Sequence, residues 1–150
     1  MIELTRGDLL RSDAEAWVNT VNTKGVAGKG LALQFRREVP ENYVAYAAAA
    51  RRGEVVPGRM FVFDTGRDGP GRWVVNFPTK RHWKERTRLG DVREGLDDLV
   101  RVIRELGIRS IAVPPLGCGL GGRDWVREVE PLVRAALEPL EDVRVLLYEP

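Results

Sequence analysis

The sequence predicts a single α/β domain, with a mixed sheet of about six strands covered by helices. Two observations predict this class: short apolar runs alternate with longer segments of helical periodicity, and glycine-rich loops join several of them. A chain of 150 residues with 43% hydrophobic and 31% charged residues is large enough to bury a substantial core. We find no internal repeat and no interdomain linker.

The first half of the chain is expected to contain two strands and then two helices. These are strands at residues 2–5 and 14–19, the second running on to residue 22, and helices at residues 31–39 and 42–52. Pro40 separates the two helices, and Gly53 ends the second.

The second half is expected to contain four strands and two longer helices. The strands are at residues 60–63, 73–77, 111–113 and 143–148, and the helices open near Asp91 and Asp124. Glycines and a proline in residues 65–72 predict a hairpin. We expect Asp91 to cap its helix and Gly107 to end it. Pro131 is expected to kink the last helix or to mark its true start.

Composition excludes several classes of protein. No apolar run approaches the length of a membrane span, and the N-terminus lacks a signal-peptide pattern, so we expect a cytoplasmic protein. One cysteine excludes an internal disulfide, and with the single histidine, His82, it leaves too few ligands for a zinc site. We expect neither a metal nor a cofactor. No membrane contact is expected either.

Basic residues are unevenly distributed, although the net charge is only +2 and gives no overall argument for nucleic acid. Residues 80–88 carry five positive charges and one negative charge. Arginine greatly outnumbers lysine. The lysines are Lys24, Lys29, Lys80 and Lys84.

Two glycine-rich loops, residues 25–30 and 114–122, each lie between a predicted strand and a predicted helix. Glycine lets backbone amides approach an anion closely, and a helix N-terminus adds a favourable dipole. We therefore expect the loops to hold a diphosphate from both sides. A tight turn between two elements is the alternative for the second loop.

Neither loop fits the common nucleotide-binding motifs. Residues 117–122 satisfy Gly-x-Gly-x-x-Gly, but only one strand follows, whereas the dinucleotide fingerprint belongs to a first β-α-β unit. Two residues separate Gly25 from Gly28, and a Walker loop has four there. The sequence has no serine near His82 and no catalytic carboxylate pair, so it gives no indication of a hydrolytic triad.

Polar side chains near the first loop suit a ribose and an adenine. Asn19 and Asn22 carry amides that can bind ribose hydroxyls, or that can form turns. Asp8 can accept from an adenine amino group, or it can cap a turn. Together with the two loops, these residues indicate ADP-ribose or a close relative.

Several motifs, in order along the chain, resemble those of macrodomains. They are Gly7-Asp8-Leu9, Val18-Asn19-Thr20-Val21-Asn22, Gly25 to Gly30 and Pro115 to Gly122. The run Asn76-Phe77-Pro78-Thr79-Lys80-Arg81-His82-Trp83 resembles more narrowly the macrodomains of DarG-type antitoxins, close to the terminal ADP-ribose protein glycohydrolase branch. The resemblance spans nearly the whole chain. It implies a three-layer sandwich with a central mixed six-stranded sheet between helices.

The resemblance implies a hydrolase that removes ADP-ribose from thymidine in DNA, an antitoxin that reverses a DarT-type toxin. Asp8 and Leu9 match positions at the adenine, and Asn22 matches one at the distal ribose. The other expected ligand-binding residues are Asn19, Gly28, Lys29, Gly30, Thr79, Pro115, Leu116, Gly117, Cys118, Gly119 and Leu120. The implied partners are ADP-ribosylated single-stranded DNA, ADP-ribose as product and the toxin itself. We expect a monomer.

The resemblance assigns the chemistry to Lys80. Breaking a glycosidic C–N bond creates an oxocarbenium-like centre, and the departing base needs a proton. A neutral amine can attack that carbon and an ammonium can donate the proton, depending on a pKa that burial or cations such as Arg81 and Lys84 lower. On spacing alone, Lys80 can equally be a solvated charge. The acid that assists the lysine in the related protein glycohydrolases is absent, because Gly121 stands there; Asp124 suits a helix cap better.

The basic run also supplies candidates for contacts with DNA. The candidates for phosphate contacts are Arg81, Lys84, Arg86 and Arg88. Trp83 can stack on a base or pack inward, and His82 can orient a substrate group. Cys118 is expected to pack rather than to act as a nucleophile.

Two other functions stay open at this point: a non-enzymatic ADP-ribose reader, and a glycohydrolase acting on ADP-ribosylated protein carboxylates. The DNA sequence context, a covalent or non-covalent course of the reaction, and whether more chain normally follows Pro150 are also open.

Overall fold

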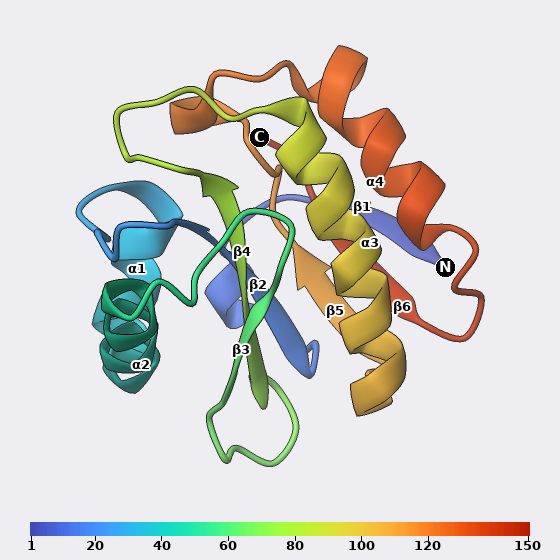
Figure 1. Cartoon of the computed structure of the whole chain (residues 1–150). Coiled ribbons are helices and arrows are strands. Elements are labelled where there is room, and N and C mark those ends of the chain that lie inside the picture. Colours follow the sequence, from blue (N-terminus) through green and yellow to red (C-terminus); the bar gives the residue numbers. More distant parts are fainter.

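The six strands form one sheet in the order β1-β6-β5-β2-β4-β3. The computed structural model describes all 150 residues (Figure 1). The strands are β1 (Ile2–Thr5), β2 (Ala16–Asn22), β3 (Phe61–Asp64), β4 (Trp73–Lys80), β5 (Ser110–Val113) and β6 (Arg144–Tyr148). All pairings are parallel except that of β3 with β4, which is antiparallel. The sheet is therefore mixed, as expected.

Two pairs of helices cover the two faces of the sheet (Figure 1). The helices are α1 (Gly30–Glu38), α2 (Pro40–Arg51), α3 (Leu89–Leu106) and α4 (Glu130–Leu137). The first two pack on one face, and the last two pack on the other. None of the four has both the length and the hydrophobicity that crossing a lipid bilayer requires.

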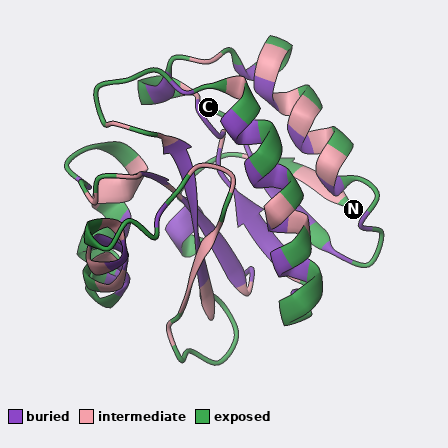
Figure 2. Ribbon diagram, in the orientation of Figure 1, coloured by how far each residue is buried: buried purple, intermediate pink, exposed green.

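Alternation along the strands builds a core on each face of the sheet. In β5, Ile111 and Val113 belong to the cluster that packs against α3 and α4, and Ala112 belongs to the cluster on the opposite face. Successive side chains of a strand point to opposite faces, so β5, which is covered on both faces, is apolar from Ile111 to Val113. Figure 2 shows the central strands buried along their length.

β4 is longer than expected and runs to Lys80. Its antiparallel neighbour β3 pairs only as far as Asn76, so one edge of β4 is free around Pro78. A proline removes a ladder hydrogen bond, and a free edge tolerates that loss. Thr79 and Lys80 therefore lie on a strand, at the carboxyl end of the parallel part of the sheet.

Asp91 does not cap α3, contrary to expectation. The helix begins at Leu89 with Arg88 as its N-cap, and Arg88 makes no side-chain cap bond. The Asp91 carboxylate lies in the first turn and accepts two hydrogen bonds from the Arg81 guanidinium, at 3.1 and 3.2 Å. A carboxylate is favourable in this turn, and its partner is a cation from the β4–α3 loop.

Pro40 does not separate the first two helices, contrary to expectation, but is the first residue of α2, where its missing backbone amide costs no helical hydrogen bond. The expectations for Gly107, Pro131 and the hairpin are confirmed. Gly107 ends α3 in the left-handed conformation, with φ 63°. Pro131 marks the start of the regular helix α4, which follows a π-helical turn at Trp125–Val129. The hairpin over residues 65–72 joins β3 to β4.

Candidate ligand-binding and catalytic site

A cavity of about 1190 Å³ opens at the carboxyl ends of the parallel strands. Its wall consists of the ends of β2, β4 and β6 and of the loops after β1, β2 and β5. Open α/β sheets bind their ligands at this edge, where loops of different strands converge. Because β1 and β4 are four strands apart in the sheet order, the cavity spans most of the width of the sheet.

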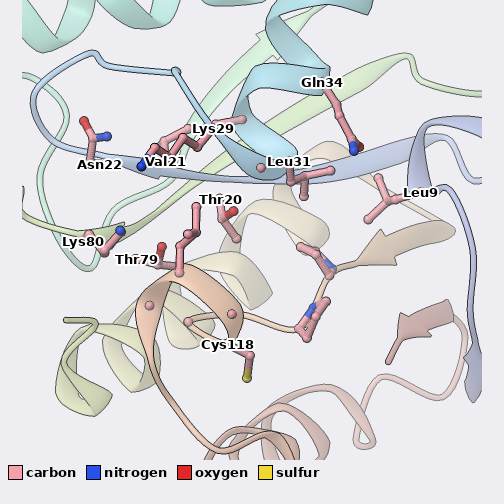
Figure 3. A pocket seen from close by; sticks show the side chains of 18 of the residues that line it. Leu9, Thr20, Val21, Asn22, Lys29, Leu31, Gln34, Thr79, Lys80 and Cys118 are labelled. Atoms are coloured by element: carbon pink, nitrogen blue, oxygen red, sulfur yellow. The ribbon is translucent and has the colours of Figure 1, made fainter. Parts of the chain in front are cut away.

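Most of the residues expected at a ligand line this cavity. They are Asp8, Leu9, Asn22, Gly28, Lys29, Gly30, Thr79, Lys80, Pro115, Gly117, Cys118, Gly119 and Leu120. Figure 3 shows Asn22 and Lys80 at one end of the cavity and Leu9 at the other. The two ends correspond to β2 and β4 on one side, and to the loop after β1 on the other.

Asn19 and Leu116 lie outside the cavity wall, contrary to expectation. Asn19 is buried on β2 and donates its side-chain amide to Oδ1 of Asn76 on β4, at 3.1 Å. A mid-strand side chain points to a face of the sheet, whereas the cavity lies at its edge. Leu116 is fully buried in the core cluster shared with α3. Burying its apolar side chain anchors the second glycine loop.

Asn22 and two tyrosines of α2 fix the first glycine loop. The Asn22 side-chain amide donates to the Val26 carbonyl oxygen at 2.8 Å. The Tyr46 hydroxyl donates to the Asn22 carbonyl oxygen at 2.6 Å, and the Tyr43 hydroxyl donates to the Gly25 carbonyl oxygen at 3.1 Å. Burial raises the pKa of Tyr46, so its hydroxyl keeps its proton. Asn22 therefore shapes the turn, and its second amide hydrogen remains for a ligand.

α1 begins inside the cavity wall. Lys29 is its N-cap and makes no side-chain cap bond, so the first backbone amides of the helix have no partner from the cap side chain. Gly28, Lys29, Gly30 and the first residues after them line the cavity. The expected contribution of a helix dipole to anion binding therefore applies to this loop.

The second loop reaches its helix by a longer route than expected. After β5, a 3-10 turn spans Gly119–Gly121, and the helical segment begins only at Trp125. The Asp124 carboxylate caps it by accepting from the Arg127 backbone amide at 3.0 Å. Neither Asp124 nor this helix lines the cavity, so the expected helix dipole is wrong for the second loop. Its contribution to the wall is glycine backbone.

The two loops meet across the cavity at Gly30 and Leu120. Gly30 has φ +59°, and a Cβ placed on it would lie 3.3 Å from Leu120 Cδ1. The two loops, which are expected to hold a ligand from both sides, therefore come within van der Waals reach of each other at this point.

Lys80 lies at the β4 end of the cavity, and its Nζ donates to the Trp83 carbonyl oxygen at 2.8 Å. Burial lowers the pKa of the Lys80 ammonium, and the nearby Lys29 ammonium lowers it further. Arg81 and Lys84, which were expected to lower this pKa, do not contribute to the shift. Arg81 is paired with Asp91 instead. A lowered pKa raises the fraction of neutral amine near neutral pH.

No side chain fits at Gly121. A Cβ placed there would overlap Oγ1 of Thr87, whose side chain is fully buried and whose hydroxyl has no hydrogen-bond partner. The Thr87 backbone amide also donates to the Gly121 carbonyl oxygen, at 3.0 Å. The acid absent from this position is therefore excluded by packing as well as by sequence.

Trp83 and Lys84 line the cavity, whereas Arg81 and His82 do not. The Trp83 side chain is 43% exposed, so it does not pack inward. The His82 ring stacks on it, with ring centroids 3.8 Å apart and planes 25° from parallel. Burial raises the pKa of the Cys118 thiol to about 11, which keeps it protonated and a poor nucleophile.

Sequence reasoning missed several residues of the cavity wall. The residues outside every predicted loop and motif are Leu31, Ala32, Gln34, Tyr148 and Glu149. The residues inside a predicted loop or motif that were not named as ligand contacts include Thr20, Val21, Val26 and Pro114. Thr20 and Val21 could have been identified from their position at the carboxyl end of a predicted parallel strand. Tyr148 and Glu149 could not be placed, because the position of β6 between β1 and β5 is a property of the strand order.

A broad cavity at the ends of parallel strands, with two opposed glycine loops and an uncapped helix N-terminus, is typical of phosphate-binding α/β domains. The pattern of the macro domain family matches residues 18–131. The chain belongs to this family, and the expected family and fold are confirmed.

Curated and solved relatives are similar over the whole chain. A DNA ADP-ribosyl glycohydrolase of Mycobacterium tuberculosis is 55% identical over 100% of this chain, which spans 42% of that relative. The solved macrodomain of Mycobacterium tuberculosis DarG has a TM-score of 0.97, with 100% of this chain and 98% of that chain covered. Thermosipho africanus DarTG in complex with ADP-ribose has a TM-score of 0.93 at 35% identity, covering 99% of this chain and 41% of that chain.

Proposed function

We propose that this domain is a DNA ADP-ribosyl glycohydrolase that removes ADP-ribose from thymidine and so reverses a DarT-type toxin. The observation that carries the proposal is Lys80, an amine of lowered pKa at one end of a cavity with two anion-binding loops. The 55% identity to a DNA ADP-ribosyl glycohydrolase supports it. A transferase–glycohydrolase fusion protein, 35% identical to this chain, supports the toxin as partner. We also propose that the domain acts as a monomer in the cytoplasm, where such DNA lies.

The charges around the cavity orient ADP-ribose. The carboxylates in the cavity wall are Asp8 and Glu149, both at the end formed by β1 and β6. Oδ1 of Asp8 accepts from the Leu10 backbone amide and so caps the turn after β1. Oδ2 lies 3.7 Å from Nε of Arg11, an exposed pair, and keeps a lone pair that can accept from the adenine amino group. The diphosphate then lies between the two glycine loops, and the distal ribose reaches Lys80.

Two chemical courses suit the environment of Lys80. As a neutral amine, it attacks the anomeric carbon while the C–N bond electrons leave with the base, and water later displaces the lysine. As an ammonium, it donates its proton to the departing base while water attacks the carbon. No carboxylate lines this end of the cavity, so lysine is the side chain there that can exchange a proton.

The proposal is tested with a single-stranded oligonucleotide that carries ADP-ribose on one thymidine. Chromatography of the products should show free ADP-ribose and intact oligonucleotide. Absence of released ADP-ribose, with ADP-ribose binding retained in calorimetry, would instead identify a reader. A parallel assay on ADP-ribosylated glutamate tests whether the domain is instead a glycohydrolase acting on protein carboxylates. We expect no turnover, because the acid that assists the lysine in those enzymes is absent at Gly121.

A further inference from the structure

Three of the four lysines of the chain line the cavity, and the fourth, Lys24, lies in a turn beside its Lys80 end. The three in the cavity wall are Lys29, Lys80 and Lys84. Lys24 follows Thr23, whose backbone amide donates to the Lys80 carbonyl oxygen at 3.1 Å. The Thr23 hydroxyl also donates to the backbone of the residue after Lys80, at 2.5 Å. The turn that carries Lys24 is therefore tied to the strand end that carries Lys80.

None of these lysines forms an ion pair, although nine arginines do. The cavity's own carboxylates, Asp8 and Glu149, are at the opposite end, and Glu149 is paired with Arg6 at 3.0 Å. Glu85 is the acid of the β4–α3 loop, and it is exposed. Positive charge therefore remains uncompensated at the Lys80 end, which favours a polyanion.

Exposed apolar side chains lie at the same opening. Val26, Trp83 and Leu120 are 36%, 43% and 62% exposed, and all three line the cavity. Large apolar groups exposed beside unpaired cations are typical of surfaces that bind single-stranded nucleic acid, where bases stack and phosphates meet lysines. Stacking on His82 holds the Trp83 ring in place.

We propose that these residues form a binding surface for an unpaired nucleic-acid strand, the strand rim, made of Lys24, Val26, Lys29, Trp83, Lys84 and Leu120. The inference rests on the proposed function and assigns the residues that hold its substrate. Trp83 stacks on a neighbouring base, Val26 and Leu120 contact apolar base surfaces, and the lysines contact flanking phosphates. The strand is unpaired because a base within a duplex exposes neither its face to Trp83 nor its glycosidic bond to Lys80.

Binding of an unmodified single-stranded thymidine oligonucleotide, measured by fluorescence anisotropy over a range of salt, tests the rim without catalysis. We expect Lys24→Ala to reduce the slope of log affinity against log salt by about 0.7. Trp83→Ala should weaken binding by about five- to 150-fold, with the slope unchanged.

Arg104→Ala is the matched control. It removes the same charge from an exposed, ion-pair-free position in the last turn of α3, outside this cavity. If Lys24→Ala and Arg104→Ala changed the slope equally, the change would be an effect of net charge alone, and the proposed strand rim would be wrong. Unchanged affinity in Trp83→Ala would overturn the stacking contact.

Hydrolysis separates failure of the rim from failure of the proposed function. The ADP-ribosylated oligonucleotide is compared with ADP-ribosylated thymidine nucleoside, which offers no strand. We expect Lys24→Ala and Trp83→Ala to lower the ratio of kcat/KM for the two substrates by about fivefold or more, mainly through KM. A wild-type protein that binds the strand but cleaves neither substrate contradicts the proposed function alone. Equal, salt-independent kcat/KM for both substrates contradicts the rim alone.

Discussion

Three features set the environment of the Lys80 ammonium. It donates a hydrogen bond to the Trp83 carbonyl oxygen, and both its partial burial and the nearby Lys29 ammonium lower its pKa. If Lys80 moves a proton or attacks carbon, Lys80→Ala should lower kcat by about 10²- to 10⁴-fold. ADP-ribose affinity, measured by calorimetry, should stay within about threefold, because the loops supply binding. Lys80→Arg should fail as well, since a guanidinium keeps both its charge and its proton. Unchanged turnover in either variant would exclude Lys80 from the reaction.

The pH dependence of kcat tests the role of Lys29. Its positive charge lowers the pKa of Lys80, so Lys29→Ala should raise that pKa towards the ordinary lysine value. The limb of the pH–kcat profile assigned to Lys80 should therefore move to higher pH. A rate that rises with pH along this limb indicates attack by the neutral amine, and a rate that falls indicates proton donation. Lys29→Arg keeps the charge and should leave the limb in place.

Gly121 and Thr87 should behave as an interacting pair. Gly121→Ala forces a methyl group against Thr87 Oγ1, and overpacking of this kind costs about 1–3 kcal/mol. In a Thr87→Ala background most of that cost should disappear, because the hydroxyl is gone. A double-mutant cycle by urea unfolding measures the coupling. Additive effects of the two substitutions would mean that the loop relaxes away from Thr87.

At the scale of elements, α2 positions the first glycine loop through its tyrosines. Tyr46→Phe removes the hydroxyl that donates to Asn22 at 2.6 Å and leaves a buried carbonyl oxygen with one partner fewer. A lost hydrogen bond of about 0.5–1.5 kcal/mol should weaken ADP-ribose binding by about two- to tenfold in calorimetry. Val44→Ala, on the exposed side of the same helix, is the control. Equal affinity in Tyr46→Phe would show that the loop keeps its shape without α2.

Element boundaries were predictable where local chemistry decides them. Gly107 ends α3 and Pro131 begins α4 because their backbones permit little else at those positions. Asp91 and the end of β4 were not predictable. Asp91 is drawn to Arg81 by tertiary contact, and Pro78 stays within a strand only because β3 stops at Asn76.

At the scale of the molecule, the cavity joins loops from both ends of the chain, so filling it should stabilise the fold. At 100 times its dissociation constant, ADP-ribose should add about 2.7 kcal/mol of stability and raise Tm by roughly 5–11 °C. Differential scanning calorimetry measures the shift. Adenosine monophosphate, which fills only the end near Asp8, should raise Tm less at the same concentration. Equal shifts would contradict the orientation proposed for ADP-ribose.

The sequence by itself determined the elements and the two glycine loops, because periodicity, glycine and proline act locally. Its contiguous motifs also made Lys80 the candidate for the reactive group, through their resemblance to those of the family. Only the tertiary structure decided that Lys29 faces Lys80, that Thr87 closes the wall at Gly121 and that Asn19 and Leu116 are buried. These facts depend on strand order and loop packing, which bring together residues that are distant in the chain. A sequence records the side chains of a site, and the sheet sets the distances between them.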